Sequence, residues 1–207
     1  MNINILKTSI LPLGADIISN INKDFNQINL LYVGTLNGRK IEDTIKGCKL
    51  FSEKYPDCYF IYDIVGDGKG NILEKLTNII EDDKLSDKII LHGFIPNNKL
   101  KPFFDKSNVG ISYVPITDYY NHQPPTKTYE YILSGLFTIA TNTYSNREVI
   151  NNVNGVLIED TPEDFSQALE FIHLNRNFDS KNIRETLIEH TWEKIVNSKL
   201  IPILENI

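Results

Sequence analysis

The chain has 207 residues, of which 41% are hydrophobic and 23% are charged, and its formal net charge is −6. This length and composition are typical of one globular domain with a sizeable core and room for a short appended segment. The negative charge argues against a nucleic-acid binder, and two cysteines without a CxxC pairing argue against a structural disulfide or zinc site.

Short apolar runs alternate with segments of helical spacing along most of the chain. In chain order, the sequence predicts strands at residues 30–34, 59–66, 88–93, 109–114, 137–141 and 155–158, and helices at residues 41–53, 71–80, 97–106, 126–134, 162–173 and 192–205. This alternation predicts an α/β fold, a Rossmann-like three-layer α/β/α arrangement with a mainly parallel sheet. Such sheets bind ligands at the carboxyl ends of their strands.

Three regions are expected. Residues 1–29 fit the strand–helix alternation poorly and are interpreted as a linker or the remnant of a preceding domain. Residues 30–190 form the predicted Rossmann-like domain, and residues 191–207 form a C-terminal helix. No apolar run reaches membrane-spanning length and the N-terminus lacks the features of a signal peptide, so the expected location is the cytoplasm.

Residues 123–135 carry the most information about function, because a proline-stiffened loop there leads into a helix closed by glycine. Thr126, Lys127 and Thr128 would offer amides and a cation to an anion at the start of this helix. Glu130 could accept hydrogen bonds from a diol, or it could simply complement the helix dipole. An anion site beside a diol acceptor would suit a nucleotide or a nucleotide sugar.

The loops after the predicted strands supply further candidates. Gly34 and Thr35 open a loop that carries Arg39, a side chain suited to a diphosphate, although a flexible turn with a solvated Arg–Lys pair is the other interpretation. Gly66 begins either a ligand contact or a plain turn, and Phe94 could present its ring to a nucleobase or belong to a turn. The first loop matches neither the GxGxxG nor the Walker pattern.

Taken in order, these pieces resemble the C-terminal, donor-binding domain of GT-B glycosyltransferases, in the large retaining group called family 4. The motifs that carry the resemblance lie at residues 30–36, 66–68, 91–96, 125–140, 146–150 and 154–158, within a region of about residues 30–205. The resemblance implies an enzyme that moves a sugar from a nucleotide diphosphate sugar to a hydroxyl acceptor. It also implies retention of configuration, no bound metal or other cofactor, and a place in polysaccharide or glycoconjugate biosynthesis.

The same resemblance implies roles for individual residues. Arg39 and Lys127 would stabilise the diphosphate charge, and Glu130 would bind the ribose hydroxyls, which makes these three the predicted catalytic residues. The predicted donor-binding residues are Gly34, Thr35, Gly66, Phe94, Ile95, His122, Thr126 and Thr128. Two departures from the family pattern affect the donor. His122 stands where many members have a glutamate that touches the sugar, and Thr35 stands where many have an arginine.

Length is the largest departure, since a complete GT-B enzyme also has an N-terminal acceptor domain of similar size. Only residues 7–16 look like the exit linker of such a domain. The expected partners are therefore a nucleotide-sugar donor and a hydroxyl acceptor bound through a missing domain or a partner chain, which would also be the only route to a membrane. The alternatives are a non-catalytic nucleotide-sugar-binding subunit of a split transferase and a sugar-nucleotide epimerase of GT-B type. A regulatory domain of flavodoxin-like shape is less favoured.

Overall fold

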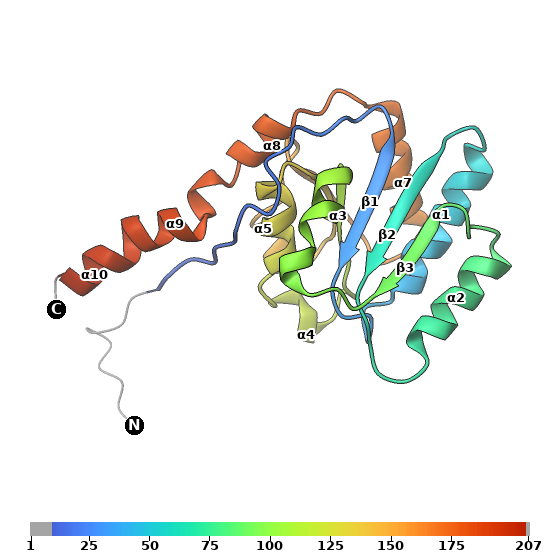
Figure 1. Ribbon diagram of the computed structural model, residues 1–207, viewed down its shortest axis with the longest axis horizontal. Helices are drawn as coiled ribbons and strands as arrows, with labels where there is room; N and C mark the ends of the chain where they lie inside the picture. The colour runs from blue at the N-terminus through green and yellow to red at the C-terminus, as the bar shows by residue number, and fades with distance from the viewer. Residues whose placement is uncertain (1–9, 206–207) are drawn as a thin grey trace.

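The structure is a computed structural model that describes residues 10–205 of the chain. One six-stranded sheet forms its centre, in the order β3-β2-β1-β4-β5-β6, and all neighbouring strands are parallel (Figure 1). The strands are β1 (Ile28–Val33), β2 (Phe60–Val65), β3 (Ile89–Gly93), β4 (Val109–Ser112), β5 (Phe137–Thr141) and β6 (Gly155–Ile158). The predicted Rossmann-like α/β fold is confirmed.

Helices cover both faces of this sheet. They are α1 (Ile41–Lys54), α2 (Ile72–Asp82), α3 (Lys101–Lys106), α4 (Asp118–Asn121), α5 (Thr126–Leu133), α6 (Tyr144–Arg147), α7 (Pro162–Leu174), α8 (Ser180–Glu185), α9 (Trp192–Ile195) and α10 (Ile201–Glu205). Three shorter turns join them, η2 (Asn97–Lys99), η3 (Ile188–His190) and η4 (Val196–Leu200). In Figure 1, α3 and α5 lie in front of the strands, whereas α1 and α7 pack together behind them.

The core follows from the side-chain alternation of the central strand β1. Leu30 and Tyr32 belong to the large apolar cluster that includes residues of α1 and α7. Leu31 and Val33 belong to a second cluster with Phe104 of α3, on the other face. A strand that is covered on both faces needs apolar residues at consecutive positions, which is why β1 appears in the sequence as a continuous apolar run.

The winding of the sheet reverses between β1 and β4. From β1 the chain builds outward to β2 and β3, and it then returns to the other side of β1 to add β4, β5 and β6. The two halves meet where Leu30 pairs with Val109 and Leu31 with Gly110, a boundary that we call the seam. Because the loops after β1 and β4 leave toward opposite faces, a crevice forms at the carboxyl end of the seam.

Several short elements differ from the sequence-based expectation. The predicted helix at residues 97–106 is divided into η2 and α3, because Pro102 has no N–H to donate to the preceding turn. The predicted helix at residues 192–205 is interrupted by the π turn η4, which precedes Pro202 in α10. The helices α4, α6 and α8 were not expected, since four to six residues are too few to show helical periodicity.

Residues 15–27, which we call the N-terminal strap, pack along the domain before β1 begins. The backbone N–H of Ala15 donates to His190 (3.0 Å), and the amides of Ile18 and Ser19 donate to the buried Ser134 Oγ (3.2 and 3.3 Å). In Figure 1 the chain leading into the strap runs beside α9. The predicted domain boundaries stay predictions, and residues 1–9 and 206–207 lie outside the described part.

None of the helices within residues 10–205 combines the length and apolar character needed to span a lipid bilayer.

Candidate functional site

A cavity of about 130 Å³ opens at the carboxyl end of the seam, where sheets of this topology bind ligands. Its walls come from the end of β1 and its loop, from β4 and the loop toward α5, from the start of α5, and from the segment around α6. They comprise Tyr32, Val33, Gly34, Thr35, Arg39, Ile111, Ser112, Tyr113, Val114, Tyr120, Gln123, Pro124, Pro125, Thr126, Lys127, Thr143 and Asn146. Among these described wall residues, the charged ones are both cations. The cavity is therefore suited to an anion.

The backbone of the β1 loop is fixed by close packing against the loop after β2. The N–H of Gly34 donates to Val65 (3.0 Å), and that of Gly66 donates to Gly93 (2.9 Å). A Cβ on residue 66 would overlap the carbonyl oxygen of Gly34, so glycine is required at residue 66 by this approach. The hydroxyl of Tyr32 donates to the carbonyl of Thr35 (2.6 Å) and completes the turn.

Arg39 reaches across the cavity toward the segment that contains α4. Its guanidinium carbon lies 4.5 Å from the centre of the Tyr120 ring, and its Nη1 donates to Gln123 Oε1 at 3.3 Å. The β1 loop and the α4 segment stand on opposite halves of the sheet. These contacts therefore close one side of the cavity over the seam.

Lys127 enters the cavity from the second position of α5 and makes an ion pair with Glu130. The distance from Lys127 Nζ to Glu130 Oε2 is 2.6 Å, and both side chains are partly exposed. The amide of Thr126 donates to Pro124 (3.1 Å), and the amide of Thr128 donates to Pro125 (3.0 Å). Two of the amides predicted to meet an anion are thus already used within the loop, so the ammonium of Lys127 is the main positive group at this helix start.

A buried polar network fixes the direction of α5. The Oγ1 atom of Thr128 lies 2.7 Å from Ser112 Oγ in β4 and 2.9 Å from Asn146 Oδ1 in α6. The side-chain amide of Asn146 also donates to the carbonyl of Thr141 (2.9 Å). Thr128 and Asn146 are almost completely buried. The network joins two strands to two helices directly below the cavity and holds Lys127 in place.

The structure brings together only part of the predicted site. Gly34, Thr35, Arg39, Thr126 and Lys127 line the cavity, whereas the other predicted site residues, which are Gly66, Phe94, Ile95, His122, Thr128 and Glu130, do not. The Phe94 ring is 73% exposed on the loop after β3. His122 is exposed and its ring lies 4.9 Å from that of Tyr144, outside the cavity wall.

Aromatic and amide residues in the cavity wall were missed by sequence reasoning. Tyr113 follows β4, and its hydroxyl is buried with no hydrogen-bond partner among the described residues. Burial raises the pKa of this hydroxyl, and Asp43 and Asp160 raise it further, so the group stays neutral. Tyr120 lies in the four-residue helix α4 and Gln123 just beyond it, in a polar stretch whose sequence shows no periodicity. Only their position between a predicted strand end and the predicted anion site pointed toward them.

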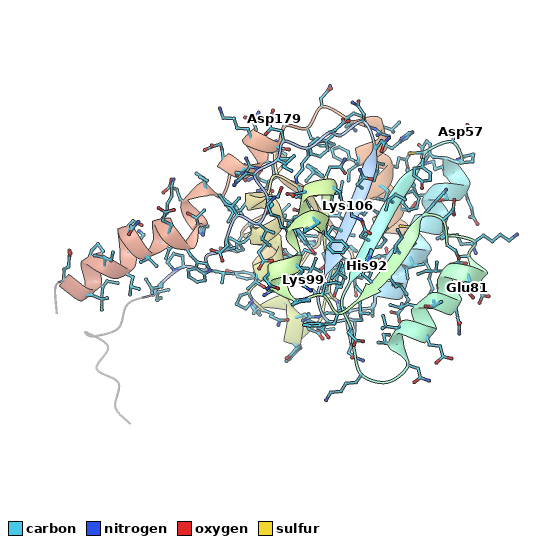
Figure 2. All side chains as sticks on the ribbon, in the orientation of Figure 1. Asp57, Glu81, His92, Lys99, Lys106 and Asp179 are labelled. Atoms are coloured by element: carbon cyan, nitrogen blue, oxygen red, sulfur yellow. The ribbon has the colours of Figure 1, made fainter. Side chains whose placement is uncertain are left out.

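A second cluster of charged side chains lies away from the cavity, on the front face of β2 and β3. The buried carboxylate of Asp63 contacts His92 Nε2 at 2.6 Å and Lys106 Nζ at 2.8 Å. Figure 2 shows His92 and Lys106 on this same face of the sheet. Both carboxylate oxygens are paired, so the cluster satisfies a buried charge. Within residues 10–205, no group of three or more His, Cys, Asp or Glu side chains is arranged to hold a metal ion.

The family to which the chain belongs follows from a comparison of its sequence. The family model described as glycosyl transferases group 1 matches residues 27–175, which include the sheet, the β1 loop and α5. The chain belongs to this glycosyltransferase family, and the resemblance stated from its motifs is confirmed. No curated protein is significantly similar to it in sequence.

Solved structures of glycosyltransferases share the fold. A glycosyltransferase from Rickettsia africae has a TM-score of 0.70 and 18% identity, over 87% of this chain and 48% of that chain. The lipopolysaccharide outer core galactosyltransferase WaaB has a TM-score of 0.71 and 16% identity, over 96% and 56%. Anabaena HepE in complex with UDP has a TM-score of 0.66 and 13% identity, over 88% and 50%. The chain thus spans about half the length of these proteins.

Proposed function

We propose that this chain binds a nucleotide diphosphate sugar through its diphosphate and is the donor-binding half of a glycosyltransferase. The observation that carries the proposal is the pairing of Arg39 and Lys127. They come from opposite halves of the sheet and line one cavity at the seam, and no acidic residue within residues 10–205 lines that cavity with them. Membership of the glycosyltransferase family supports this assignment. The UDP bound to the similarly folded HepE supports it as well.

The size of the cavity is consistent with a site for the diphosphate part of the donor alone. Ligand pockets generally begin at roughly 300 Å³, so a cavity of about 130 Å³ would enclose only part of a nucleotide sugar. The cationic cavity would take the diphosphate, and the base would lie toward the loop after β3, where Phe94 and Ile95 stand. The pneumococcal transferase GtfA, which also shares the fold, was solved with UDP and GlcNAc.

Glu130 and Lys127 would exchange partners when the donor binds. In the free chain the carboxylate of Glu130 is held by Lys127 at 2.6 Å. A diphosphate would take over the ammonium, because it brings more negative charge to the same place. The released carboxylate would then accept hydrogen bonds from the ribose hydroxyls, as the family motif implies. Binding of the diphosphate and recognition of the ribose would in this way be coupled.

Transfer would break the bond between the anomeric carbon of the sugar and an oxygen of the diphosphate. The acceptor oxygen forms the new glycosidic bond to that carbon, and its proton passes to the departing nucleoside diphosphate. Negative charge grows on the leaving diphosphate. Arg39 and Lys127 would stabilise that charge without a metal ion, because their positions are fixed before the reaction begins. We also propose, from the family resemblance, that configuration is retained and that the product is a polysaccharide or glycoconjugate made in the cytoplasm.

Calorimetric titration with UDP, GDP and ADP tests the binding site. We expect at least one nucleotide to bind, and we expect Arg39→Ala and Lys127→Ala each to weaken binding roughly 10- to 100-fold, because each removes a charge-assisted contact. Lys181→Ala, at an exposed lysine in α8, is the matched control and should bind like wild type. Absence of binding by wild type, or unchanged binding by an Arg39→Ala, Glu130→Ala double variant, would refute the site.

Turnover is proposed to need a second domain, because the chain spans about half the length of the similar transferases. That domain would bind the acceptor, whether it belongs to the same polypeptide or to a partner chain. We expect the chain alone to bind nucleotide and to transfer sugar slowly. A radiolabelled-sugar transfer assay with and without the candidate acceptor-domain protein measures this directly. Rapid transfer by the chain alone would contradict the proposal that a second domain is needed for turnover.

A further inference from the structure

The helix α4 turns one aromatic side chain back toward the β1 loop. Tyr120 places its ring 4.5 Å from the guanidinium carbon of Arg39. Gln123, just beyond the helix, accepts from Arg39 Nη1 at 3.3 Å. Tyr120 lies outside the segment 123–135 from which the site was predicted, and Gln123 is the first residue of that segment but was given no role. Both residues contact Arg39, one of the two cations on which the proposed function depends.

This stacking leaves the guanidinium ready for an anion. Among residues 10–205, no carboxylate forms a salt bridge with Arg39. The guanidinium carbon lies over the Tyr120 ring, and this cation–π contact uses none of the N–H donors. Gln123 engages Nη1 alone, so most of the five donors remain for a ligand. Arg39 therefore keeps its full charge and most of its hydrogen-bonding capacity.

Tyr120 is itself held firmly. Its amide is capped by the hydroxyl of Thr117, and its carbonyl accepts from the amide of Gln123 at 3.1 Å. The ring of Tyr119 lies 4.9 Å away at a steep angle. The side-chain oxygen of Asn121 accepts from the amide of Tyr144 (2.6 Å) and ties α4 to α6. A short helix with these attachments gives Arg39 a fixed surface on which to rest.

We propose that Tyr120 is a positioning residue that preorganises Arg39 to bind the donor diphosphate. The inference rests on the proposed function and deepens it, because it assigns the diphosphate specificity of the cavity to a residue that acts through Arg39. A free arginine side chain loses rotamer entropy when it binds a ligand, and the contact with Tyr120 removes part of that freedom before the ligand arrives. Tyr120 thereby strengthens binding of diphosphates and not of uncharged nucleosides.

The test compares two ligands in four proteins. The ligands are the nucleoside diphosphate that binds most tightly in the titrations above and its parent nucleoside. For Tyr120→Leu we expect diphosphate affinity to fall roughly 2- to 30-fold, the range of a cation–π contact, with nucleoside affinity unchanged. Tyr120→Phe keeps the ring and should restore wild-type affinity. Tyr59→Leu, at an exposed tyrosine that precedes β2 and lies outside the cavity wall, is the matched control.

Two outcomes would overturn the inference while leaving the proposed function intact. One is equal loss in Tyr120→Phe and Tyr120→Leu, which would assign the effect to the hydroxyl. The other is a further loss when Tyr120→Leu is added to Arg39→Ala, since a residue that acts through Arg39 has no effect once Arg39 is gone.

A measurement without ligand keeps the inference testable if no nucleotide binds. In ¹⁵N NMR spectra, the Nε–H proton of Arg39 should be shifted upfield by the tyrosine ring in wild type and in Tyr120→Phe. The shift should disappear in Tyr120→Leu. An unshifted proton in wild type would show that the stacking is not populated and would end the proposal. Failure of the nucleotide titrations alone would instead count against the donor site.

Discussion

At the scale of single residues, two buried tyrosines differ in whether their hydroxyl groups are hydrogen-bonded. The hydroxyl of Tyr131 in α5 accepts a hydrogen bond from the amide of Val33 at 2.8 Å. The hydroxyl of Tyr113 has no partner within the described residues. Both side chains are at most 1% exposed. Burying a polar group that has no hydrogen-bond partner costs free energy. Removing a group that does form a hydrogen bond leaves its former partner buried and unsatisfied.

Substitution of these two tyrosines by phenylalanine should change the stability in opposite directions. Tyr131→Phe should lower the free energy of unfolding by about 1–3 kcal/mol, because the amide of Val33 would remain buried without an acceptor. Tyr113→Phe should raise it by about 1 kcal/mol, because an unsatisfied hydroxyl is removed and the ring is kept. Urea titration followed by circular dichroism measures both. A loss of stability in Tyr113→Phe would contradict the unpaired state of this hydroxyl.

At the scale of elements, a partly buried lysine attaches the N-terminal strap to the domain. Lys23 Nζ donates to the carbonyl of Phe104 at 2.5 Å and to Ser19 Oγ at 2.9 Å. The pKa of Lys23 is lowered from 10.5 to about 8, chiefly by burial; Asp105 opposes this shift and Arg184 contributes to it. The ammonium thus satisfies a carbonyl at the end of α3 while its burial works against its charge.

The lowered pKa of Lys23 predicts a pH dependence with a definite sign. Below about pH 8 the lysine is protonated in both the folded and the unfolded chain, and the full cost of burying its charge applies. Between that pH and 10.5 the unfolded chain binds more protons, so Lys23 adds stability as the pH rises. The unfolding free energy of wild type minus that of Lys23→Met should therefore increase over this interval. A constant or decreasing difference would contradict the burial of this ammonium.

Elements with a local cause were predictable from the sequence, and contacts between distant segments were not. The strand at residues 28–33 follows from its apolar run, and α5 follows from Pro125 and from Gly135, whose φ of 76° allows the chain to leave the helix. The strap has no periodicity, and Ser134 binds it from more than 100 residues away. Its packing therefore left no pattern that local reasoning could read.

In the candidate site too, features with a local sequence pattern were predictable, and contacts between distant segments were not. Arg39 and Lys127 were found because their residue types and positions after strands already suggest an anion site. The Tyr120 contact depends on how the β1 loop meets the α4 segment across the seam, which no local pattern describes. The predicted role of Glu130 in binding the ribose stays a prediction, because its carboxylate contacts Lys127 and does not line the cavity.

At the scale of the whole molecule, the layers predict where the fold is most resistant to opening. The strands β1, β4 and β5 are central, paired on both sides, and covered by helices on both faces. In Figure 1, α9 and α10 extend away from the sheet, and the described residues of α10 are not buried. Stability is distributed unevenly in such a structure, because local opening exposes little surface at its periphery.

Hydrogen exchange followed by NMR should reproduce this gradient. In a sample shown to be monomeric by light scattering, amides of β1, β4 and β5 should exchange slowest, near the limit set by global unfolding. Amides of α10 should exchange fastest among the helices α1 to α10. Equal protection of α10 and the central strands would contradict the arrangement of layers. Added nucleotide should slow exchange in the loops that form the cavity.

The position of the cavity on the seam has a mechanical consequence. Arg39 is carried by the half of the sheet that contains β1, and Lys127 by the half that contains β4, and the halves meet through two registered residue pairs. An anion bound by both side chains would link the two halves across the seam. Twisting motions that separate the halves would weaken this binding, and tight binding would reduce the amplitude of those motions. Occupancy of the cavity and stiffness of the sheet are therefore expected to rise and fall together.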